Sequence, residues 1–288
     1  MSTVPAIPGD HHAKVRRRFR PSWNLVVGSL LTGSLCLIAL LSLVWTPLPP
    51  TKMQIIHRLK PPLEQGLLGT DQFGRDLASM LMVGAWNSLS TALIAVLLGG
   101  VLGTALGLLA AARRGIVEGA VMRISDVLFS LPPILSAMML GALMGSGRFT
   151  AVIAIAVFMV PVFARVVAAS SRQIWARDYI LAARGAGKGK TRITIEHVLP
   201  NVSGQIIVQA TLQLGLAILT EAGLSFLGLG LAPPAPTWGR MLAEAQTFLG
   251  PAPWLALLPG TAIALAVLGF NMLGDGLRDL FDPRERRR

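Results

Sequence analysis

The stretch Leu77–Ala112 reads LASMLMVGAWNSLSTALIAVLLGGVLGTALGLLAAA and contains no Asp, Glu, Lys or Arg. A helix needs about 20 mostly apolar residues to cross the hydrocarbon core of a bilayer, and this stretch exceeds that length. A soluble domain made from this chain would have no core large enough to hide so much apolar surface. The stretch therefore predicts a membrane-spanning helix.

The composition of the whole chain also indicates a membrane protein. Hydrophobic residues make up 53% of the 288 residues and charged residues 14%, whereas globular proteins have about 25% charged residues. The mean hydropathy is +0.62. Disordered chains are polar and highly charged, so disorder is excluded. The single cysteine, Cys36, excludes a disulfide scaffold and a multi-cysteine metal site, and we expect no metal site.

The other charge-poor stretches complete the predicted architecture. Alternating apolar and polar residues that could build a barrel are absent from the sequence. The expected fold is an all-α membrane protein with six transmembrane helices. These helices are expected at residues 23–46, 88–111, 126–144, 149–169, 206–230 and 254–273.

The distribution of Lys and Arg orients this bundle. Of the 26 basic residues, 20 lie in segments on one side of the predicted helices and 6 on the other. The richer side is cytoplasmic by the positive-inside rule. The tails 1–22 and 275–288 are therefore expected in the cytoplasm, and residues 47–87 outside it. Nucleic-acid binding would need one soluble basic stripe and is not expected from a net charge of +12 spread in this way.

Two motifs that would make the chain an enzyme are incomplete. Gly185–Thr191 resembles a phosphate-binding loop, G-x-x-x-x-G-K-[ST], but Arg184 stands where its first glycine would have to be. Gly223–Gly228 holds a serine near glycines, but the pattern G-x-S-x-G needs glycine where Leu227 stands. We expect this chain neither to bind ATP nor to be an enzyme.

The longest predicted cytoplasmic loop, residues 170–205, is expected to contain two helices. A loop whose basic residues served only to orient the protein in the membrane would not need them. A helix is expected to start at Asp178, and a second one to run from Thr191 until Pro200 stops it. Small residues on one face of the first helix would let another surface approach closely. The residues expected on that face are Tyr179, Ala182, Ala183 and Ala186. These residues alone leave open whether the loop docks a partner or is an ordinary basic loop.

Part of this loop resembles a family signature. Leu181–Gly187, the next nine residues and His197–Pro200 are similar to E-A-A-x-x-x-G-x(9)-I-x-L-P, the mark of permease subunits of binding-protein-dependent ABC transporters. Leu181 replaces the glutamate and His197 the isoleucine, so no role of that glutamate carries over. The residues to which the resemblance assigns ATPase docking are Ala182, Ala183, Arg184, Gly187, Lys188, His197, Leu199 and Pro200.

Three further segments are similar to the C-type permeases for dipeptides, oligopeptides or nickel. Gly69–Asp76 matches G-T-D-x-x-G-R-D before the second helix, Ser225–Gly230 matches the exit of the fifth helix, and Asn271–Asp279 matches the C-terminal end, which closes at Asp282-Pro283. The matching residues of the extracytoplasmic motif are Gly69, Thr70, Asp71, Gly74, Arg75 and Asp76.

The resemblance implies a type I ABC importer permease that forms half of a translocation path. Residues 88–274 would be its transmembrane domain, and residues 170–205 the ATPase-docking loop.

The expected partners are a second homologous permease subunit, two cytoplasmic ABC ATPases, an extracytoplasmic solute-binding protein and the lipid of the bacterial inner membrane. ATP and magnesium would bind to the ATPases, and no cofactor to this chain. Di- or oligopeptides are the expected cargo, nickel or another chelated metal is the alternative, and a non-ABC channel or carrier is a remote one.

Glu221 is the most costly residue in the predicted spans. A carboxylate at a helix centre costs about 2.5–3.5 kcal/mol to insert, so it should face the bundle interior or a wet cavity. Glu221 either lines the translocation path, where it would meet a peptide amine or a cation, or forms a buried ion pair. Arg165 on a neighbouring helix is the candidate partner for such a pair.

Overall fold

The computed structural model describes residues 22–281, with the backbone alone for Pro133. Within this range the chain forms helices and a single isolated bridge, between Thr70 and Asp76. Five long helices make up the body: α1 (Trp23–Leu41), α2 (Leu77–Ala112), α5 (Arg148–Trp175), α8 (Leu199–Phe226) and α10 (Trp254–Phe281). The all-α prediction is confirmed. The basic run of the N-terminal tail and Asp282-Pro283 lie outside the described residues.

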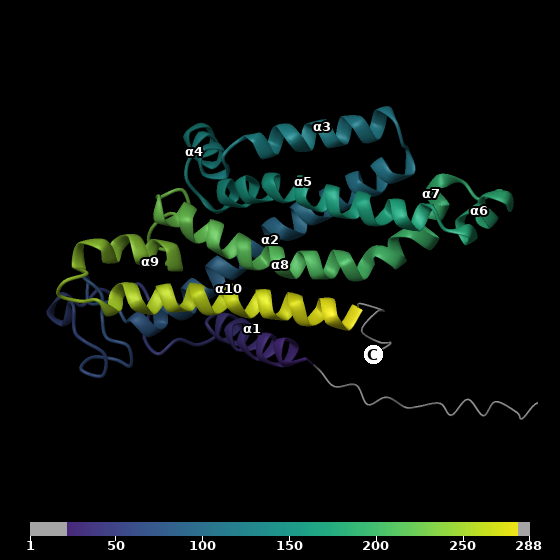
Figure 1. Ribbon diagram of the computed structural model, residues 1–288. Coiled ribbons are helices and arrows are strands. Elements are labelled where there is room, and N and C mark those ends of the chain that lie inside the picture. Colours follow the sequence, from purple (N-terminus) through teal and green to yellow (C-terminus); the bar gives the residue numbers. More distant parts are fainter. Residues whose placement is uncertain (1–21, 282–288) are drawn as a thin grey trace, which may run out of the picture.

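Shorter helices connect and extend this body. They are α3 (Ile116–Ser130), α4 (Pro133–Met144), α6 (Asp178–Gly185), α7 (Lys190–Ile193) and α9 (Trp238–Ala245). Two 3-10 turns, η1 (Ile55–His57) and η3 (Gln246–Phe248), and a π-helical turn, η2 (Thr194–Val198), complete the described elements. In Figure 1, α6 and α7 project at one end of the bundle, while α9 lies at the other end.

Five helical segments are long and apolar enough to cross a membrane, and α3 with α4 makes a sixth if this bent pair is one span. The pair is bent by 88°. The single helix expected near 126–144 is therefore two helices, α3 and α4, which meet at a sharp bend. Its physical reason is the proline pair: Leu131, just before Pro132, is extended (φ −89°, ψ 128°), as the residue before a proline prefers to be.

Helix α2 begins at Leu77, well before the predicted residue 88, because Asp76 caps it. The Asp76 Oδ2 atom accepts hydrogen bonds from the Ser79 backbone N–H at 2.8 Å and from the Ser79 hydroxyl at 2.7 Å. An acidic side chain in this position satisfies a backbone donor that the first turn leaves free. The last part of the predicted extracytoplasmic segment 47–87 is thus helical.

Small residues bring α2 and α5 into close contact. A Cβ atom added to Gly103 would lie 2.4 Å from the Val160 carbonyl oxygen, and one on Gly107 would lie 2.6 Å from the Ala164 carbonyl oxygen. In a bilayer, where lipid is as apolar as leucine, close backbone packing is a main source of helix association. Helix α10 packs in turn against both α1 and α8.

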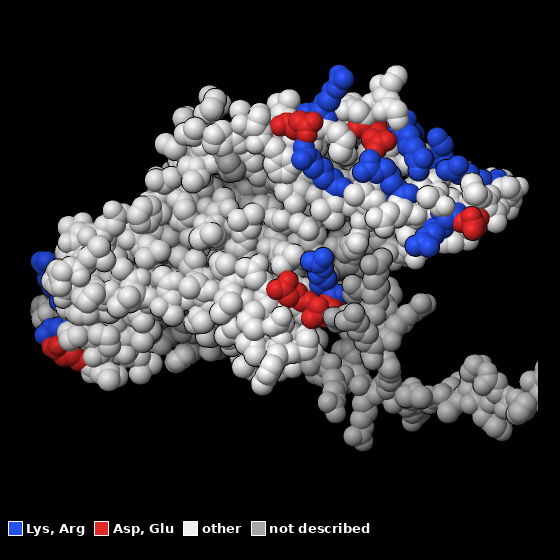
Figure 2. Space-filling view, viewed as in Figure 1, with Lys and Arg blue, Asp and Glu red and all other residues white. Residues whose placement is uncertain are grey.

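Charged side chains are unevenly spread over the molecule. Figure 2 shows Lys and Arg concentrated toward the end that carries α6 and α7, while most of the visible body is uncharged. Uncharged sides suit contact with lipid, because a charged side chain is costly in hydrocarbon. The charged end is the one that the positive-inside rule assigns to the cytoplasm.

Candidate functional site

Helix α6 is seated on the rest of its own chain by an apolar cluster. Ile180 is 0% and Ala183 9% exposed. They pack with Trp175 at the end of α5, with Val198 just before α8 and with Val202 in its first turn. The guanidinium of Arg184 lies 5.0 Å from the centre of the Trp175 ring, which is within cation–π range. This helix is therefore held at a fixed place relative to α5 and α8.

The outward face of α6 differs from the predicted one at Ala183. Tyr179, Ala182 and Ala186 are exposed, as predicted, but Ala183 faces the apolar cluster under the helix. Ala183 lies three residues after Ile180, and residues so spaced share one face of a helix. Since Ile180 is the large apolar residue that anchors α6, Ala183 is turned inward with it.

Gly187 ends α6 in a left-handed conformation. Its φ is +82°, its N–H bonds to the Arg184 carbonyl at 2.9 Å, and the Lys188 N–H bonds to the Ala183 carbonyl at 3.1 Å. This pair of bonds is the Schellman motif, in which glycine is preferred because it has no Cβ to clash. The glycine of the signature thus serves to end the helix and turn the chain toward α7.

Gly187→Ala is expected to destabilise this turn by about 1–2 kcal/mol, the cost of the left-handed conformation for a residue with a Cβ atom. Gly189→Ala is the matched control, because Gly189 has φ −70° and ψ 159° and open space around it. The measurement is the proteolysis rate of the loop in the purified permease. Equal rates for the two variants would contradict the role given to Gly187.

Ionic contacts fasten the chain after Gly187. The Lys188 ammonium donates to Glu196 Oε2 at 2.6 Å and lies 3.2 Å from His197 Nε2. Arg192, one helical turn before Glu196, donates to Glu196 Oε1 at 2.5 Å. These side chains are partly or largely exposed, so the contacts order the loop without adding much stability. His197, which departs from the signature, takes part in this polar cluster.

The prediction that Pro200 stops the second helix is wrong. Helix α7 runs through the π-helical turn η2 directly into α8, and Pro200 lies in the first turn of α8. In a regular α-helix the proline ring would clash with the carbonyl four residues earlier. The wider turn, in which the Leu199 N–H bonds to the Thr194 carbonyl, accommodates the ring. The segment of α7 and η2 is therefore continuous with helix α8.

The predicted extracytoplasmic motif, Gly69–Asp76, is an ion-paired loop. Asp71 accepts hydrogen bonds from the backbone N–H of Phe73 at 2.9 Å and of Arg75 at 2.8 Å, and from Arg75 Nε at 2.5 Å. The other end of the Arg75 guanidinium donates to Glu244 of α9 at 2.9 Å. Arg75 is 6% and Asp71 3% exposed. The motif thus ties the loop between α1 and α2 to α9.

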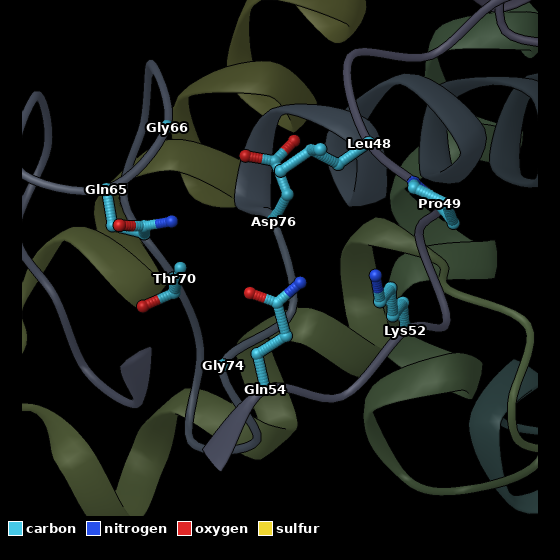
Figure 3. A pocket seen from close by; sticks show the side chains of 9 residues that line it. All are labelled: Leu48, Pro49, Lys52, Gln54, Gln65, Gly66, Thr70, Gly74 and Asp76. Atoms are coloured by element: carbon cyan, nitrogen blue, oxygen red, sulfur yellow. The ribbon is translucent and has the colours of Figure 1, made fainter. Parts of the chain in front are cut away.

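The remaining motif residues shape the same loop. Thr70 donates to the His57 carbonyl and accepts from the Lys60 N–H. Gly74 has φ +71°, and a Cβ there would lie 1.9 Å from the Gln54 carbonyl oxygen. Figure 3 shows Thr70, Gln54 and Asp76 around a small pocket in this loop. Because Asp76 already caps α2, we interpret this pocket as part of the loop's framework.

Glu221 is fully buried where α8 meets α2 and α9. It is 0% exposed, and its Oε1 accepts a hydrogen bond from the Ser225 hydroxyl at 2.6 Å. Its Oε2 is buried without a hydrogen-bond partner among the described residues. Ser88 of α2 and Arg148 at the start of α5 are near enough to interact with the carboxyl group. The expectation that Glu221 faces the bundle interior is met.

Arg165 does not pair with Glu221. Its guanidinium pairs with Asp126 of α3 and lies 4.5 Å from the centre of the Phe129 ring. Both charged side chains are exposed, so this pair sits at the outer surface of the bundle. The predicted Glu221–Arg165 pair is wrong because the face of α5 that carries Arg165 packs on α3, away from α8.

Sequence reasoning missed Glu244, Arg240 and Ser88. Arg240 and Glu244 stand four residues apart and are hydrogen-bonded at 2.9 Å on α9. Two opposite charges four residues apart, in a region that is otherwise apolar, indicate a helical turn on which the two side chains can pair. Ser88 gave no such signal, because a single serine in a charge-free span has no distinguishing neighbour in the sequence.

The described residues hold no group of three or more His, Cys, Asp or Glu that could bind a metal. The described helices form an apolar bundle with five or six membrane-spanning segments, the architecture of a multi-pass membrane protein. The model of the family described as binding-protein-dependent transport system inner membrane component matches residues 103–287, and the chain belongs to this family.

Several curated proteins are similar over most of this chain. It is 40% identical over 259 residues to the dipeptide transport system permease protein DppC of Alkalihalophilus pseudofirmus, covering 90% of this chain and 85% of that protein. It is 42% identical over 265 residues to the di/tripeptide transport system permease protein DppC of Pseudomonas aeruginosa, covering 90% and 88%. It is 45% identical over 217 residues to the glutathione transport system permease protein GsiD of Pectobacterium atrosepticum, covering 75% and 72%.

Among solved structures, the MetNI methionine ABC transporter in an inward-facing conformation is similar in fold. The TM-score is 0.57 at 20% identity, over 69% of this chain and 94% of that chain. The predicted permease fold is thereby confirmed. The chain is a multi-pass inner-membrane permease subunit of an ATP-driven ABC importer, and not an enzyme, since the ATPase is a separate subunit. The family implies both ATPase and solute-binding partners.

Proposed function

We propose that this permease imports short peptides. The observation that carries the proposal is the 40–42% identity, over 90% of the chain, to permeases named for dipeptides and di/tripeptides. Nickel or another chelated metal is not favoured, because these relatives are named for peptides. The described residues also offer no cluster of His, Cys, Asp or Glu that would hold a metal ion.

Peptide uptake by the complete transporter tests this function. Cells that lack other peptide importers and express the transporter should accumulate a labelled dipeptide, and deletion of this chain should abolish the accumulation. A matched culture supplied with radioactive nickel should show no difference between the two strains. Nickel uptake without dipeptide uptake would overturn the peptide proposal.

The proposed assembly pairs this chain with a second, homologous permease, two ATPases and a solute-binding protein. ATP and magnesium would be bound by the ATPases, where hydrolysis takes place. The long exposed apolar face of α2, which includes Leu97, Val101 and Leu102, leaves ample surface for lipid or for the second permease. Hydrolysis would then drive the path between states open to opposite sides of the membrane.

We propose that α6 docks the ATPase through its outward face. Ala182 and Ala186 are exposed and small, and Tyr179 beside them is 45% exposed. A face of this shape lets a partner's surface approach the helix backbone closely. Arg184, Lys188, His197, Leu199 and Pro200 would support docking by holding the loop in place. Because α7 continues into α8, a movement of the docked ATPase would move α8 as a lever.

The orientation of the proposed assembly can be tested with cysteine labelling. In a Cys36→Ala background, a cysteine replacing the exposed Gln246 beside α9 should react with a membrane-impermeant thiol reagent in intact cells. A cysteine replacing the exposed Lys190 in α7 should react only after the membrane is opened. Both sites are exposed, so the difference in reactivity reports sidedness alone. The reverse pattern would overturn the orientation and the docking proposal.

A further inference from the structure

A cavity with a mixed apolar and polar lining lies between α5, α8 and α10, on the half of the bundle nearer to α6. Its volume is about 520 Å³, within the range of about 300–1,000 Å³ that is usual for small-molecule sites. Figure 1 shows α8 running between the other two helices. Most of the lining is apolar, such as Val208 and Leu212, but Ser170, Gln205, Gln209 and Arg278 also line it.

Three glutamines follow one face of α8: Gln205 and Gln209 line the cavity, and Gln213 lies one turn beyond its lining. Gln205, Gln209 and Gln213 are spaced four residues apart, which places them on neighbouring turns of the helix. Among the described residues none of the three side-chain amides has a hydrogen-bond partner, and Gln213 Oε1 is buried. A buried amide without a partner is costly in an apolar environment. The burial cost applies to Gln213, while Gln205 is exposed and Gln209 half-buried. The amides of Gln205 and Gln209 are thus free to bond to a molecule in the cavity, and that of Gln213 to one that extends a turn further along α8.

The spacing of the three amides fits an extended peptide chain. Four residues of helix rise about 6 Å, and two residues of an extended chain advance about 6.6–6.8 Å. A glutamine amide offers both a donor and an acceptor, the complement of the C=O and N–H of a peptide group. Successive glutamines could therefore bond to every second peptide group along the cargo, whatever its side chains are.

We propose that Gln205, Gln209 and Gln213 form a ladder that hydrogen-bonds the backbone of peptide cargo as it passes this permease. The inference rests on the proposed peptide function and deepens it, because it names the part of the cargo that is recognised. From Gln205 to Gln213 the ladder rises about 12 Å, the length of three to four extended residues. Recognition of the backbone lets one path carry peptides of different sequence.

Substitution to leucine in the complete, reconstituted transporter tests the ladder. Leucine has a similar size and is favoured in membrane helices, so Gln205→Leu and Gln209→Leu should insert normally. Each should lower the uptake of labelled trialanine about 3- to 10-fold, as expected for the loss of one hydrogen bond to the cargo. Uptake of a tripeptide with charged side chains should fall by the same factor. Gln173→Leu, at an exposed position of α5, is the matched control and should leave uptake unchanged.

Photocrosslinking provides the second measurement. A benzoylphenylalanine at position 209 should capture labelled trialanine during turnover, while the same residue at the exposed Leu97 of α2 should not. Capture of the second permease alone at position 209 would overturn the ladder. Unchanged uptake by Gln205→Leu and Gln209→Leu, with active wild type, would overturn the ladder but keep the peptide function. No peptide uptake by wild type would overturn both.

Discussion

Ala182→Asp is expected to abolish peptide uptake and to remove the ATPase from the purified transporter. If the outward face of α6 is buried against the ATPase, a charge there has no partner, and an unpaired buried charge costs about 3–5 kcal/mol. That cost corresponds to an affinity at least about 100-fold weaker. The permease itself should remain at normal levels, because Ala182 is exposed in the isolated chain. Uptake and ATPase retention should be measured on the same preparations.

Two companion variants show which face of α6 is involved. Ala182→Ser adds one small polar atom and should retain most of the uptake. Ala183→Asp should instead reduce the amount of folded permease, because Ala183 lies in the apolar cluster with Ile180 and Trp175. Normal ATPase retention in Ala182→Asp would refute docking by this face. Loss of retention with normal permease levels in Ala183→Asp would contradict the inward position of that residue.

Arg75→Met is expected to destabilise the loop between α1 and α2 strongly. The substitution leaves Asp71 without its ion pair in a site where it is 3% exposed, and frees Glu244 from the same guanidinium. Breaking a buried pair by removing one partner typically costs about 3–5 kcal/mol. We expect a lower melting temperature of the purified permease and rapid proteolysis between α1 and α2.

Arg58→Met is the matched control, because Arg58 is exposed in the same loop. Its effect should stay within about 0.5 kcal/mol, as for most surface substitutions. A double variant, Arg75→Met with Asp71→Asn, should recover part of the lost stability, since the unpaired charge of Asp71 is then removed while Glu244 keeps its ion pair with Arg240. Equal melting temperatures for Arg75→Met and Arg58→Met would refute a structural role of the motif.

The sequence alone predicted the family and five of the membrane-spanning helices, and the sixth predicted span is the bent pair α3 and α4. A charge-free stretch such as Leu77–Ala112 can hardly be anything except a membrane helix, because only lipid can cover so much apolar surface. The distribution of Lys and Arg likewise predicts which side of the membrane each loop faces. This prediction uses the number of basic residues in each loop and requires no tertiary contacts. Gly187 and the surrounding signature residues indicated the loop that we assign to docking, although they did not show its conformation.

The tertiary structure alone determined which side chains meet. Arg75 reaches Glu244 across 169 positions of sequence, Arg165 pairs with Asp126 of α3, and Ala183 is turned inward by Ile180 on its own helix. A membrane-spanning helix can be predicted from the number of consecutive apolar residues, which does not depend on which other segments it contacts. A buried contact depends on how the helices rotate and bend as they pack, and the bend at Pro132 is an example. The rotation and bending depend on all the packed surfaces together.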